Sequence, residues 1–321
     1  MPERSSSCTS QRARPVRVLK FGGTSVGAAD GLRNVCRIIR DAVGTCHPVV
    51  VVSAASGVTD DLVRAADETR GDRATAEAWV RHVGRRYRAL AKEVVGDGPA
   101  CSQYEPVLQA ELSELRRALQ GGAGTDASAA RDAVMATGER LMAPLLAALL
   151  AADGCPARPV DATALIRTDD AHGDATVQWE PTRQQTRAWF REWTEATEIV
   201  VPVVTGFIGA TAEGTTTTIG RGGSDLSAAT LARALEAERL ERWTNVDGLY
   251  TRDPATHDDA RRLHQLDFEQ ARTWTKAGRL GMHPCTLDPL AAADIPVHVR
   301  CTHRPDAEGT RIVPAASTVH S

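Results

Sequence analysis

The 321-residue sequence is poor in aromatic residues and carries no strong excess of either charge. Phenylalanine, tryptophan and tyrosine make up 4% of the residues, and the formal net charge at pH 7 is −3. A chain with this balance generates no overall field that attracts nucleic acid or an anionic membrane. The length suffices for a sizeable core, either as one large α/β domain or as two lobes.

Cysteine and histidine are present, but their spacing lacks the patterns of disulfide-rich and metal-binding proteins. No CxxC pair occurs, the number of cysteines is odd, and the nine histidines form no HExxH motif. These absences argue against a disulfide framework or a zinc site and favour reduced thiols in a cytoplasm. The seven cysteines are Cys8, Cys36, Cys46, Cys101, Cys155, Cys285 and Cys301.

No apolar run in the sequence approaches the roughly 20 residues that span a bilayer. The first fifteen residues, MPERSSSCTSQRARP, are polar and basic and lack the apolar segment of a signal peptide. We expect residues 1–15 to form a disordered tail and residues 314–321 to form a second tail. We also expect the protein to be cytoplasmic.

Short valine-rich runs separated by helical patterns are what the sequence does contain. Nearly unbroken runs of this kind are typical of strands that are covered on both faces of a mainly parallel sheet. Residues 31–43 have the pattern of a crossover helix between the first two strands. The strand candidates are residues 16–21, 48–54, 157–161, 199–206, 242–244 and 296–300.

Two helical regions complete the predicted architecture. Residues 60–152 show helical spacing and few strand signals, which indicates a helical block inserted between strands. Residues 224–238 predict a further helix, with Ser224 or Asp225 available as its N-terminal cap. The alternation of strands and helices predicts an α/β sandwich, and no linker divides the chain into independent domains.

The segment KFGGTS, residues 20–25, places a lone lysine where an apolar strand ends. Glycines let backbone N–H groups converge into a nest that attracts anions, and Lys20 beside it could neutralise a phosphoryl group in transfer. The segment matches neither the GxxxxGK[ST] phosphate loop nor GxGxxG. A tight strand-to-helix turn with a solvent-exposed lysine explains the same residues, and the segment alone does not decide between the two.

The stretch GFIGATAEGTTTTIGRGGSDLSAA, residues 206–229, is the most informative. Arg221 has a planar fork that is suited to gripping a carboxylate. Gly222 and Gly223 let a substrate or phosphate approach the backbone, and Asp225 could orient a lysine or a substrate. The alternative is a capped helix with an exposed arginine, and the order Arg, Gly-Gly, Ser, Asp makes it the weaker interpretation.

Three further segments are ambiguous when taken alone. The stretch SAASGVTDDL, residues 53–62, follows a strand and could bind a ligand at the edge of the sheet, but a plain turn explains it better. The stretch WTNVDGLYTRDP, residues 243–254, could wall a nucleotide base or ribose, but its turn signals favour a β-hairpin. Glu139 could grip a ligand amine or lie on a solvated helix face.

Taken together, these segments resemble the catalytic domain of aspartate kinases, within the amino-acid kinase family. The resemblance covers residues 16 to about 313 and follows the order of the family. The first and fourth matching motifs are highly specific, and the others are supportive. The motifs are KFGGTSV at 20–26, SAASGVT at 53–59, TGERLMA at 137–143, GFIGA to TTTTIGRGGSD at 206–225, WTNVDGLYTRDP at 243–254 and HPCTLDPLAAADIPVHVR at 283–300.

The resemblance implies a three-layer α/β/α sandwich with a central, mostly parallel sheet, formed by residues 16–313. It places a helical substrate-side block at about residues 60–152 and a nucleotide-side half at about residues 206–300. It implies ATP-dependent phosphorylation of the side-chain carboxylate of L-aspartate or a close analogue, giving an acyl phosphate, with Mg²⁺ accompanying ATP. A homodimer is expected by analogy with the family.

The resemblance also implies a role for each matching residue. Lys20 would stabilise the charge on the transferred phosphoryl group, and Asp225 would organise the site and hold Lys20. Arg221 would bind a substrate carboxylate, and Glu139 would bind its ammonium group. The residues that would complete the substrate pocket are Ser53, Thr59 and Ser224. The implied nucleotide-binding residues are Gly22, Gly23, Thr24, Ser25, Gly222, Gly223, Thr244, Asn245, Tyr250 and Arg279.

Three departures from the family pattern fall on the nucleotide side. Asn245 stands in TNV where the family usually has TDV, and Ala255 stands where an arginine usually follows DP. Leu280 stands where a lysine usually precedes HP, and Arg279, one residue away, is a candidate substitute. Loss of a cation that contacts phosphate costs on the order of a hundredfold or more in rate.

Two alternatives stay open beside aspartate phosphorylation. The same transfer could use a different acceptor, either a hydroxyl or another carboxylate. A catalytically impaired homologue could instead act as a binding or regulatory partner. The sequence stops shortly after GTRIVPAAS, so we expect no feedback through the ACT domains that aspartate kinases usually append, and a role in a specialised biosynthetic pathway.

Overall fold

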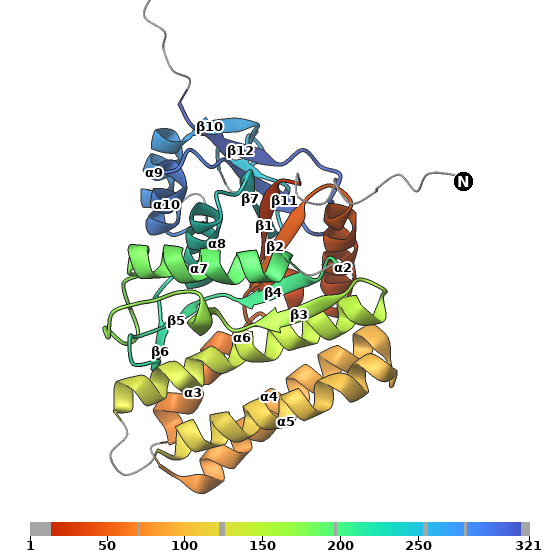
Figure 1. The fold of residues 1–321 in the computed structure, drawn as a ribbon, viewed down its shortest axis with the longest axis vertical. Helices are drawn as coiled ribbons and strands as arrows, with labels where there is room; N and C mark the ends of the chain where they lie inside the picture. The colour runs from red at the N-terminus through yellow and green to blue at the C-terminus, as the bar shows by residue number, and fades with distance from the viewer. Residues whose placement is uncertain are drawn as a thin grey trace, which may run out of the picture.

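A central eight-stranded sheet organises the computed structural model, which describes residues 14–69, 71–121, 126–195, 198–252, 256–278 and 281–315. The strand order is β10-β12-β11-β7-β1-β2-β4-β3 (Figure 1). Neighbouring strands pair in parallel except β11 and β12, which are antiparallel. The strands are β1 (Val16–Phe21), β2 (His47–Val52), β3 (Ala157–Val160), β4 (Val201–Thr205), β7 (Arg239–Thr244), β10 (Gln265–Asp267), β11 (Val297–Cys301) and β12 (Thr310–Val313).

The valine-rich runs form the interior of this sheet, as the sequence predicts. All six predicted strands are present, and their ends differ from the predicted ends by at most three residues. The side chains of Val49, Val50, Val51 and Val52 in β2 are fully buried, so this strand is covered on both faces. Strands β10 and β12, of three and four residues, are not among the predicted strands, although the equally short β3 is.

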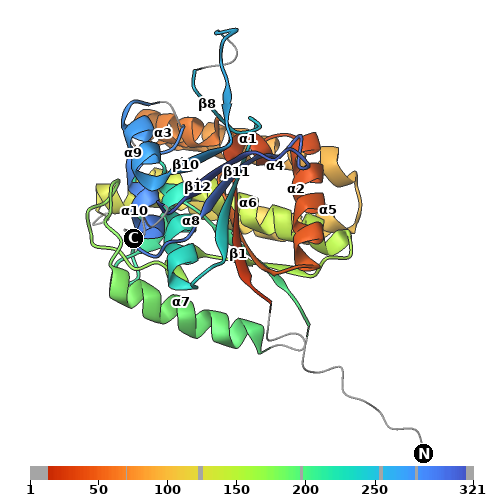
Figure 2. The same cartoon turned by 90° about the horizontal axis from the view of Figure 1, so that it is seen from above.

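Helices cover both faces of the sheet and give the predicted three layers (Figures 1 and 2). One apolar core joins the sheet to the α2–α6 layer, and the other joins it to the α7–α10 layer. The first layer contains α2 (Ala29–Val43), α3 (Val58–Thr69), α4 (Arg73–Val95), α5 (Pro99–Gln120) and α6 (Ala127–Ala152). The second contains α7 (Trp179–Thr194), α8 (Gly223–Ala234), α9 (Phe268–Lys276) and α10 (Leu287–Ala291).

Helix α6 is long and apolar enough to cross a membrane by length and composition alone, and is the one such helix among the described residues. Charged Glu139 and Arg140 interrupt its sequence, so it is not an unbroken apolar run of about 20 residues. In addition, 72% of its most apolar window is buried inside the protein, where it packs against α5, β3 and β4. Helix α6 is therefore a core helix, and its apolar surface is covered by the fold.

Short elements cluster at the carboxyl ends of the parallel strands. The four-residue helix α1 (Gly23–Val26) follows β1, and two small antiparallel pairs follow β4 and β7. These pairs are β5 (Ile208–Ala210) with β6 (Thr216–Thr218), and β8 (Leu249–Tyr250) with β9 (Arg262–Leu263). The 3₁₀ turns are η2 (Ala162–Ala164) and η3 (Pro284–Thr286). Figure 2 shows β8 standing out from the body of the molecule.

Candidate active site

Two cations project side by side from neighbouring strands at the carboxyl edge of the sheet. Lys20 of β1 and Arg242 of β7 are register partners in a parallel ladder. Side chains alternate along a strand, and Val18 and Leu240, two residues earlier, lie in the core beneath α8. Both cations therefore point toward the face of the sheet that α8 covers.

Asp225, in the first turn of α8, completes this arrangement. Lys20 Nζ lies 2.6 Å from Asp225 Oδ1, and Arg242 Nε donates to Asp225 Oδ2 at 3.1 Å. Burial raises the pKa of Asp225, but the charges of Arg242 and Lys20 outweigh this effect and lower it to about 2. Burial lowers the pKa of Lys20, although the charge of Asp225 opposes that change. The lysine and the carboxylate that the sequence singles out thus meet in one buried triad with Arg242.

A cavity of about 630 Å³ opens on one side of Lys20, and we call it the Glu139 cavity. Its walls come from the loop after β2, from α6, and from the segment that joins β6 to α8. All five residues predicted to bind the substrate line it. They are Ser53, Thr59, Glu139, Arg221 and Ser224.

Glu139 is 2% exposed and does not lie on a solvated helix face. Its Oε1 accepts a hydrogen bond of 3.0 Å from the backbone N–H of Ala54, while its Oε2 has no hydrogen-bond partner among the residues that the structure describes. Burial raises the pKa of Glu139 to about 7, although the Ala54 bond and the charge of Lys20 act in the opposite direction. A buried oxygen without a partner beside a cavity is suited to receiving a donor from a ligand.

The opposite wall of the Glu139 cavity carries Arg221, which is exposed and forms no ion pair with any residue that the structure describes. Gly222, the next residue, has a φ of +73° in the left-handed region, and a side chain there would lie 2.5 Å from His283. Glycine thus allows the sharp turn that places Arg221 at the mouth of the cavity and Ser224 inside it.

A second cavity of about 1040 Å³ lies on the other side of Lys20, and we call it the Tyr250 cavity. Lys20 and Gly23 line both cavities, so the two spaces meet at the ammonium group. A side chain at Gly22 would lie 3.7 Å from Lys20 Nζ, which means that glycine leaves room beside the charge. The predicted nucleotide-binding residues that line this cavity are Gly22, Gly23, Thr24, Thr244, Asn245 and Tyr250.

The other predicted nucleotide-binding residues are Ser25, Gly222, Gly223 and Arg279. Ser25 lines neither cavity, because its buried side chain lies 2.7 Å from the Thr302 hydroxyl and donates to the carbonyl oxygen of Trp243. Gly222 and Gly223 line the Glu139 cavity and not the Tyr250 cavity, since the turn before α8 faces the substrate side. Arg279, Ala255 and Leu280 lie outside the described residues.

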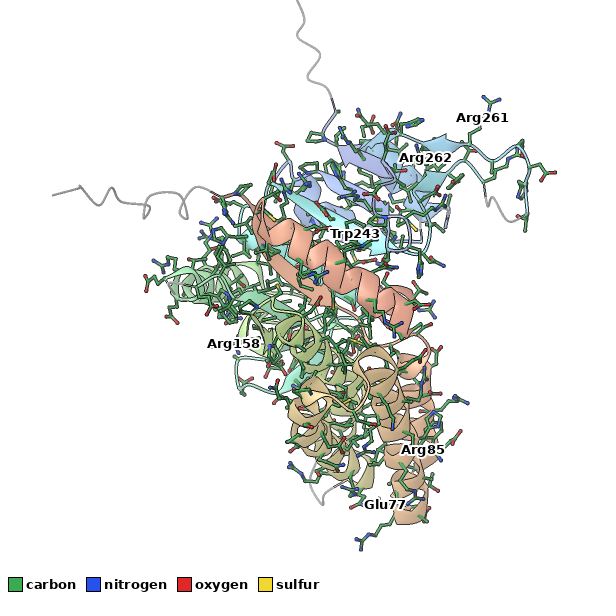
Figure 3. All side chains as sticks on the ribbon, turned by 90° about the vertical axis from the view of Figure 1, so that its right-hand side faces the viewer. Glu77, Arg85, Arg158, Trp243, Arg261 and Arg262 are labelled. Atoms are coloured by element: carbon green, nitrogen blue, oxygen red, sulfur yellow. The ribbon has the colours of Figure 1, made fainter. Side chains whose placement is uncertain are left out.

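Trp243 fixes the position of the KFGGTS turn. The tryptophan is 2% exposed, lies inside the molecule (Figure 3), and stacks on Phe21 with ring centroids 6.1 Å apart. Its carbonyl oxygen accepts a hydrogen bond from the N–H of Gly22. The ends of β1 and β7 are therefore locked together beside Lys20. Figure 3 also shows Glu77 and Arg85 of α4 at the opposite end of the molecule.

Sequence reasoning missed several residues of the site. The sequence does not distinguish Arg242 from Arg239, the other arginine of its strand, and only the register with β1 reveals its role. Phe207 lines the Glu139 cavity with a φ of +69°, which is unusual for a residue other than glycine. Val246 lines the Tyr250 cavity and is 39% exposed. The sequence offered one indication of its role, because Val246 directly follows Asn245, a predicted nucleotide-binding residue.

No three side chains of Asp, Glu, His or Cys come together to hold a metal ion in the described parts of the chain. Mg²⁺ in phosphoryl-transfer sites needs no such cage, because it is usually held by one or two carboxylates together with substrate phosphates. Asp225 lines the Glu139 cavity and pairs with Lys20, which lines both cavities. A carboxylate beside that junction fits an Mg²⁺ ion that arrives with a nucleotide.

Comparison with known proteins matches residues 15–301 to the amino acid kinase family. The chain is 32% identical to the aspartokinase of Chlamydia muridarum, with 92% of this chain and 63% of that protein covered. It is 31% identical to the lysine-sensitive aspartokinase 3 of Escherichia coli, with the same coverage. The chain thus spans about 63% of the length of these relatives.

The fold is similar to the crystal structure of E. coli aspartokinase III in complex with aspartate and ADP, in the R-state. The TM-score is 0.82, the sequences are 29% identical, and the match covers 94% of this chain and 65% of that chain. The T-state of the same enzyme, in complex with lysine and aspartate, gives a TM-score of 0.80 at 29% identity, with 94% of this chain and 66% of that chain covered. The predicted resemblance to aspartate kinases is confirmed.

Proposed function

Because the chain belongs to the amino acid kinase family, we propose that it transfers a phosphoryl group from ATP to the side-chain carboxylate of L-aspartate or a close amino-acid analogue. The observation that carries this proposal is the meeting of two cavities at the buried ammonium of Lys20. Donor and acceptor bound in these cavities would approach one another beside a positive charge. Positioning and charge neutralisation are the main tasks in phosphoryl transfer.

The Glu139 cavity has the charges that an α-amino acid requires. The carboxylate of Glu139 would accept from the ammonium group of the substrate, and Arg221 would hold a carboxylate with its two-pronged guanidinium. Both groups line one cavity, and Glu139 Oε2, which has no hydrogen-bond partner among the described residues, could accept a hydrogen bond from the substrate. The similarity to a structure solved with aspartate and ADP supports the same choice of acceptor here.

The charges around Lys20 suit a carboxylate acceptor, which needs no general base. A side-chain carboxylate is already ionised at neutral pH, so its oxygen can attack phosphorus without giving up a proton. Asp225, whose pKa is lowered to about 2, stays ionised and would act as an orienting anion. Lys20, held 2.6 Å from Asp225, would neutralise the charge that develops on the phosphoryl oxygens during transfer.

The Tyr250 cavity would hold the nucleotide. The exposed side chain of Val246 offers an apolar surface for a base, and the hydroxyl of Tyr250, which donates to Asp247 at 2.6 Å, stands nearby. Mg²⁺, when bound with ATP, would supply further neutralisation of the phosphates, with Asp225 as the nearest carboxylate of the junction. Asn245 lines this cavity where the family usually has aspartate.

We further propose that residues 16–313 act as one kinase domain, with substrate-side residues in the helical half and nucleotide-side residues near 206–300. A homodimer and a cytoplasmic location are predictions by analogy with the family. Sedimentation of the purified chain tests the first of these, and fractionation of cells that express it tests the second.

A coupled assay with a chemical trap tests the proposed function. The chain is incubated with ATP, Mg²⁺ and single amino acids, and ADP is measured together with the hydroxamate that hydroxylamine forms from an acyl phosphate. We expect ADP and hydroxamate in equal amounts with aspartate or a close analogue. ADP without hydroxamate would instead indicate a hydroxyl acceptor. Absence of acceptor-dependent ADP, together with absence of ATP binding by calorimetry, would support a binding partner.

A further inference from the structure

One buried carboxylate beside the Glu139 cavity has no part in the transfer described above. Asp132 is 1% exposed and lies on α6, seven residues before Glu139. Seven residues make two helical turns, so both carboxylates point from one face of α6. Asp132 lines the same cavity as Glu139 and Arg221.

Asp132 connects three segments of the chain through its two oxygens. The hydroxyl of Thr218, in β6, donates to Oδ1 at 2.6 Å. The backbone N–H of Gly173 donates to Oδ1 at 3.1 Å and to Oδ2 at 3.2 Å. His172 Nδ1 lies 2.7 Å from Oδ2, and because a carboxylate only accepts, this nitrogen is the donor. The carboxylate therefore joins α6 to β6 and to the loop formed by residues 169–176.

That loop in turn supports the segment that carries Arg221. The N–H of Ala175 donates to the carbonyl oxygen of Thr218 at 2.9 Å, and the hydroxyls of Thr168 and Thr217 lie 2.6 Å apart. The carboxylate of Asp174 lies against Gly220, whose φ is +71°, and any side chain at Gly220 would collide with it. Asp132 thus reaches the residues just before Arg221 both directly, through Thr218, and through the loop.

We infer that Asp132 and His172 form a clamp that positions Arg221 for the carboxylate of the amino-acid substrate. They are positioning residues, since they act through Thr218, Gly173 and the 169–176 loop. This inference rests on the proposed function for its substrate, but its structural basis stands apart from it. Among the described residues, the hydrogen bonds of the clamp reach none that lines the Tyr250 cavity, so the clamp should control the amino-acid side and leave the nucleotide side unchanged.

Kinetics of Asp132→Ala provide the first test. We expect the KM for the amino acid to rise by about tenfold or more while the KM for ATP changes less than about twofold, because only one wall loses its support. Asp132→Asn should have an intermediate effect, since an amide keeps one accepting oxygen. His172→Ala removes one bond of the clamp and should raise the amino-acid KM by about threefold.

A double-mutant cycle separates a positioning role from a merely structural one. If Asp132 acts through Arg221, adding Asp132→Ala to Arg221→Ala should raise the amino-acid KM by less than about twofold. Glu241→Ala is the matched control, because Glu241 is also buried but lines neither cavity. The control should lower thermal stability without a selective effect on the amino-acid KM. Additive effects of Asp132→Ala and Arg221→Ala would overturn the inference.

Hydrogen–deuterium exchange of the ligand-free protein tests the clamp without reference to any substrate. In Asp132→Ala, we expect faster exchange in residues 218–222 and 169–176, and unchanged exchange in residues 22–25 and 244–250. Unchanged exchange in residues 218–222 would overturn the inference even if the protein phosphorylates aspartate. Faster exchange there in a protein that phosphorylates no amino acid would overturn the proposed function and support the clamp.

Discussion

The two cavities that meet at Lys20 are built in different ways. Four charged side chains that line the Glu139 cavity, Lys20, Asp132, Glu139 and Asp225, are each at most 7% exposed, and Arg221 stands exposed at its mouth. The Tyr250 cavity shares Lys20, but much of its remaining lining comes from turns and a two-residue strand, and its Asn245 and Val246 are exposed. The core therefore holds most charges of the first cavity, while part of the wall of the second lies on the surface.

The proposed ligands account for this difference, because each would bring different groups. An amino acid is small, so its few charges need partners that are held rigidly and are shielded from water. A nucleotide would be larger and would bring phosphates that bind their own metal ion, so a cavity that is walled partly by exposed side chains can hold it. Substitutions on the buried side should therefore have large effects, and substitutions on the exposed side should have small ones.

Lys20→Ala should have the largest effect, because Lys20 belongs to both cavities. Loss of the only lysine at the junction should reduce kcat by about a thousandfold or more, since no other ammonium can take its place there. Arg242 would still pair with Asp225, so the protein should stay folded. Steady-state ADP formation measures the effect, with exposed Lys92→Ala as the control. Near-normal turnover by Lys20→Ala would contradict the assignment.

Arg221→Ala should raise the KM for the amino acid by about a hundredfold, because a two-pronged ion pair with the substrate carboxylate is lost. The KM for ATP should change by less than about twofold, since Arg221 does not line the Tyr250 cavity. Arg183→Ala, which removes a surface arginine paired with Glu180, is the control. Equal increases in both KM values would remove the distinction between the two cavities.

The pKa of Glu139 predicts how the amino-acid side responds to pH. Burial raises that pKa to about 7, so the carboxyl gains a proton as the pH falls through 7 and can no longer pair with an ammonium. The KM for the amino acid should rise about tenfold from pH 8 to pH 6. Glu139→Gln should have a high KM at both values and little pH dependence. An unchanged wild-type KM over this range would contradict the role of Glu139.

The same residue should reduce the stability of the ligand-free protein. The folded-state pKa is raised from 4.5 to about 7, so the stability present below pH 4.5 is lost as the pH rises through about 7. Glu139→Gln should therefore raise the free energy of unfolding by about 3 kcal/mol at pH 8 and by about 1 kcal/mol at pH 5. Urea unfolding at the two pH values measures this difference. A gain that is equal at both values would show that ionisation is not its cause.

The contrast between the cavities also explains what could be predicted from the sequence. Lys20 and Asp225 stand at the end of a strand and the start of a helix beside paired glycines, so local sequence is enough to identify them. Arg242 could not be recognised, because its partner depends on the register between β1 and β7. Asp132 could not be recognised either, since its partners lie 40 and 86 residues further along the chain.

The fold divides in a similar way. Strands that are buried on both faces are easy to predict, because their burial leaves a continuous run of valine and other apolar residues in the sequence. Helix α7 was missed because its sequence is polar and aromatic, and only Thr182 and Thr186 of its residues are buried. The β5–β6 pair was read as a threonine-rich segment, since three-residue strands show no usable alternation.

Among these substitutions, Asn245→Asp should have the smallest effect, and it gives the sharpest comparison of the Glu139 and Tyr250 cavities. It restores the carboxylate that the family usually carries, at an exposed position on the edge of the Tyr250 cavity. A carboxylate accepts a stronger hydrogen bond from a ribose or base than an amide does, so we expect the KM for ATP to fall about threefold. The change should leave the amino-acid KM as it is.

Asn34→Asp is the matched control for Asn245→Asp, because Asn34 is the only other asparagine in the chain and lies on α2 outside both cavities. It introduces the same charge and should leave both KM values unchanged. A higher KM for ATP in Asn245→Asp would place the phosphates, and not the ribose or base, beside residue 245, because like charges repel. A change of more than about tenfold in either direction would mean that an exposed residue contributes as much to binding as a buried one, which would contradict the contrast between the cavities.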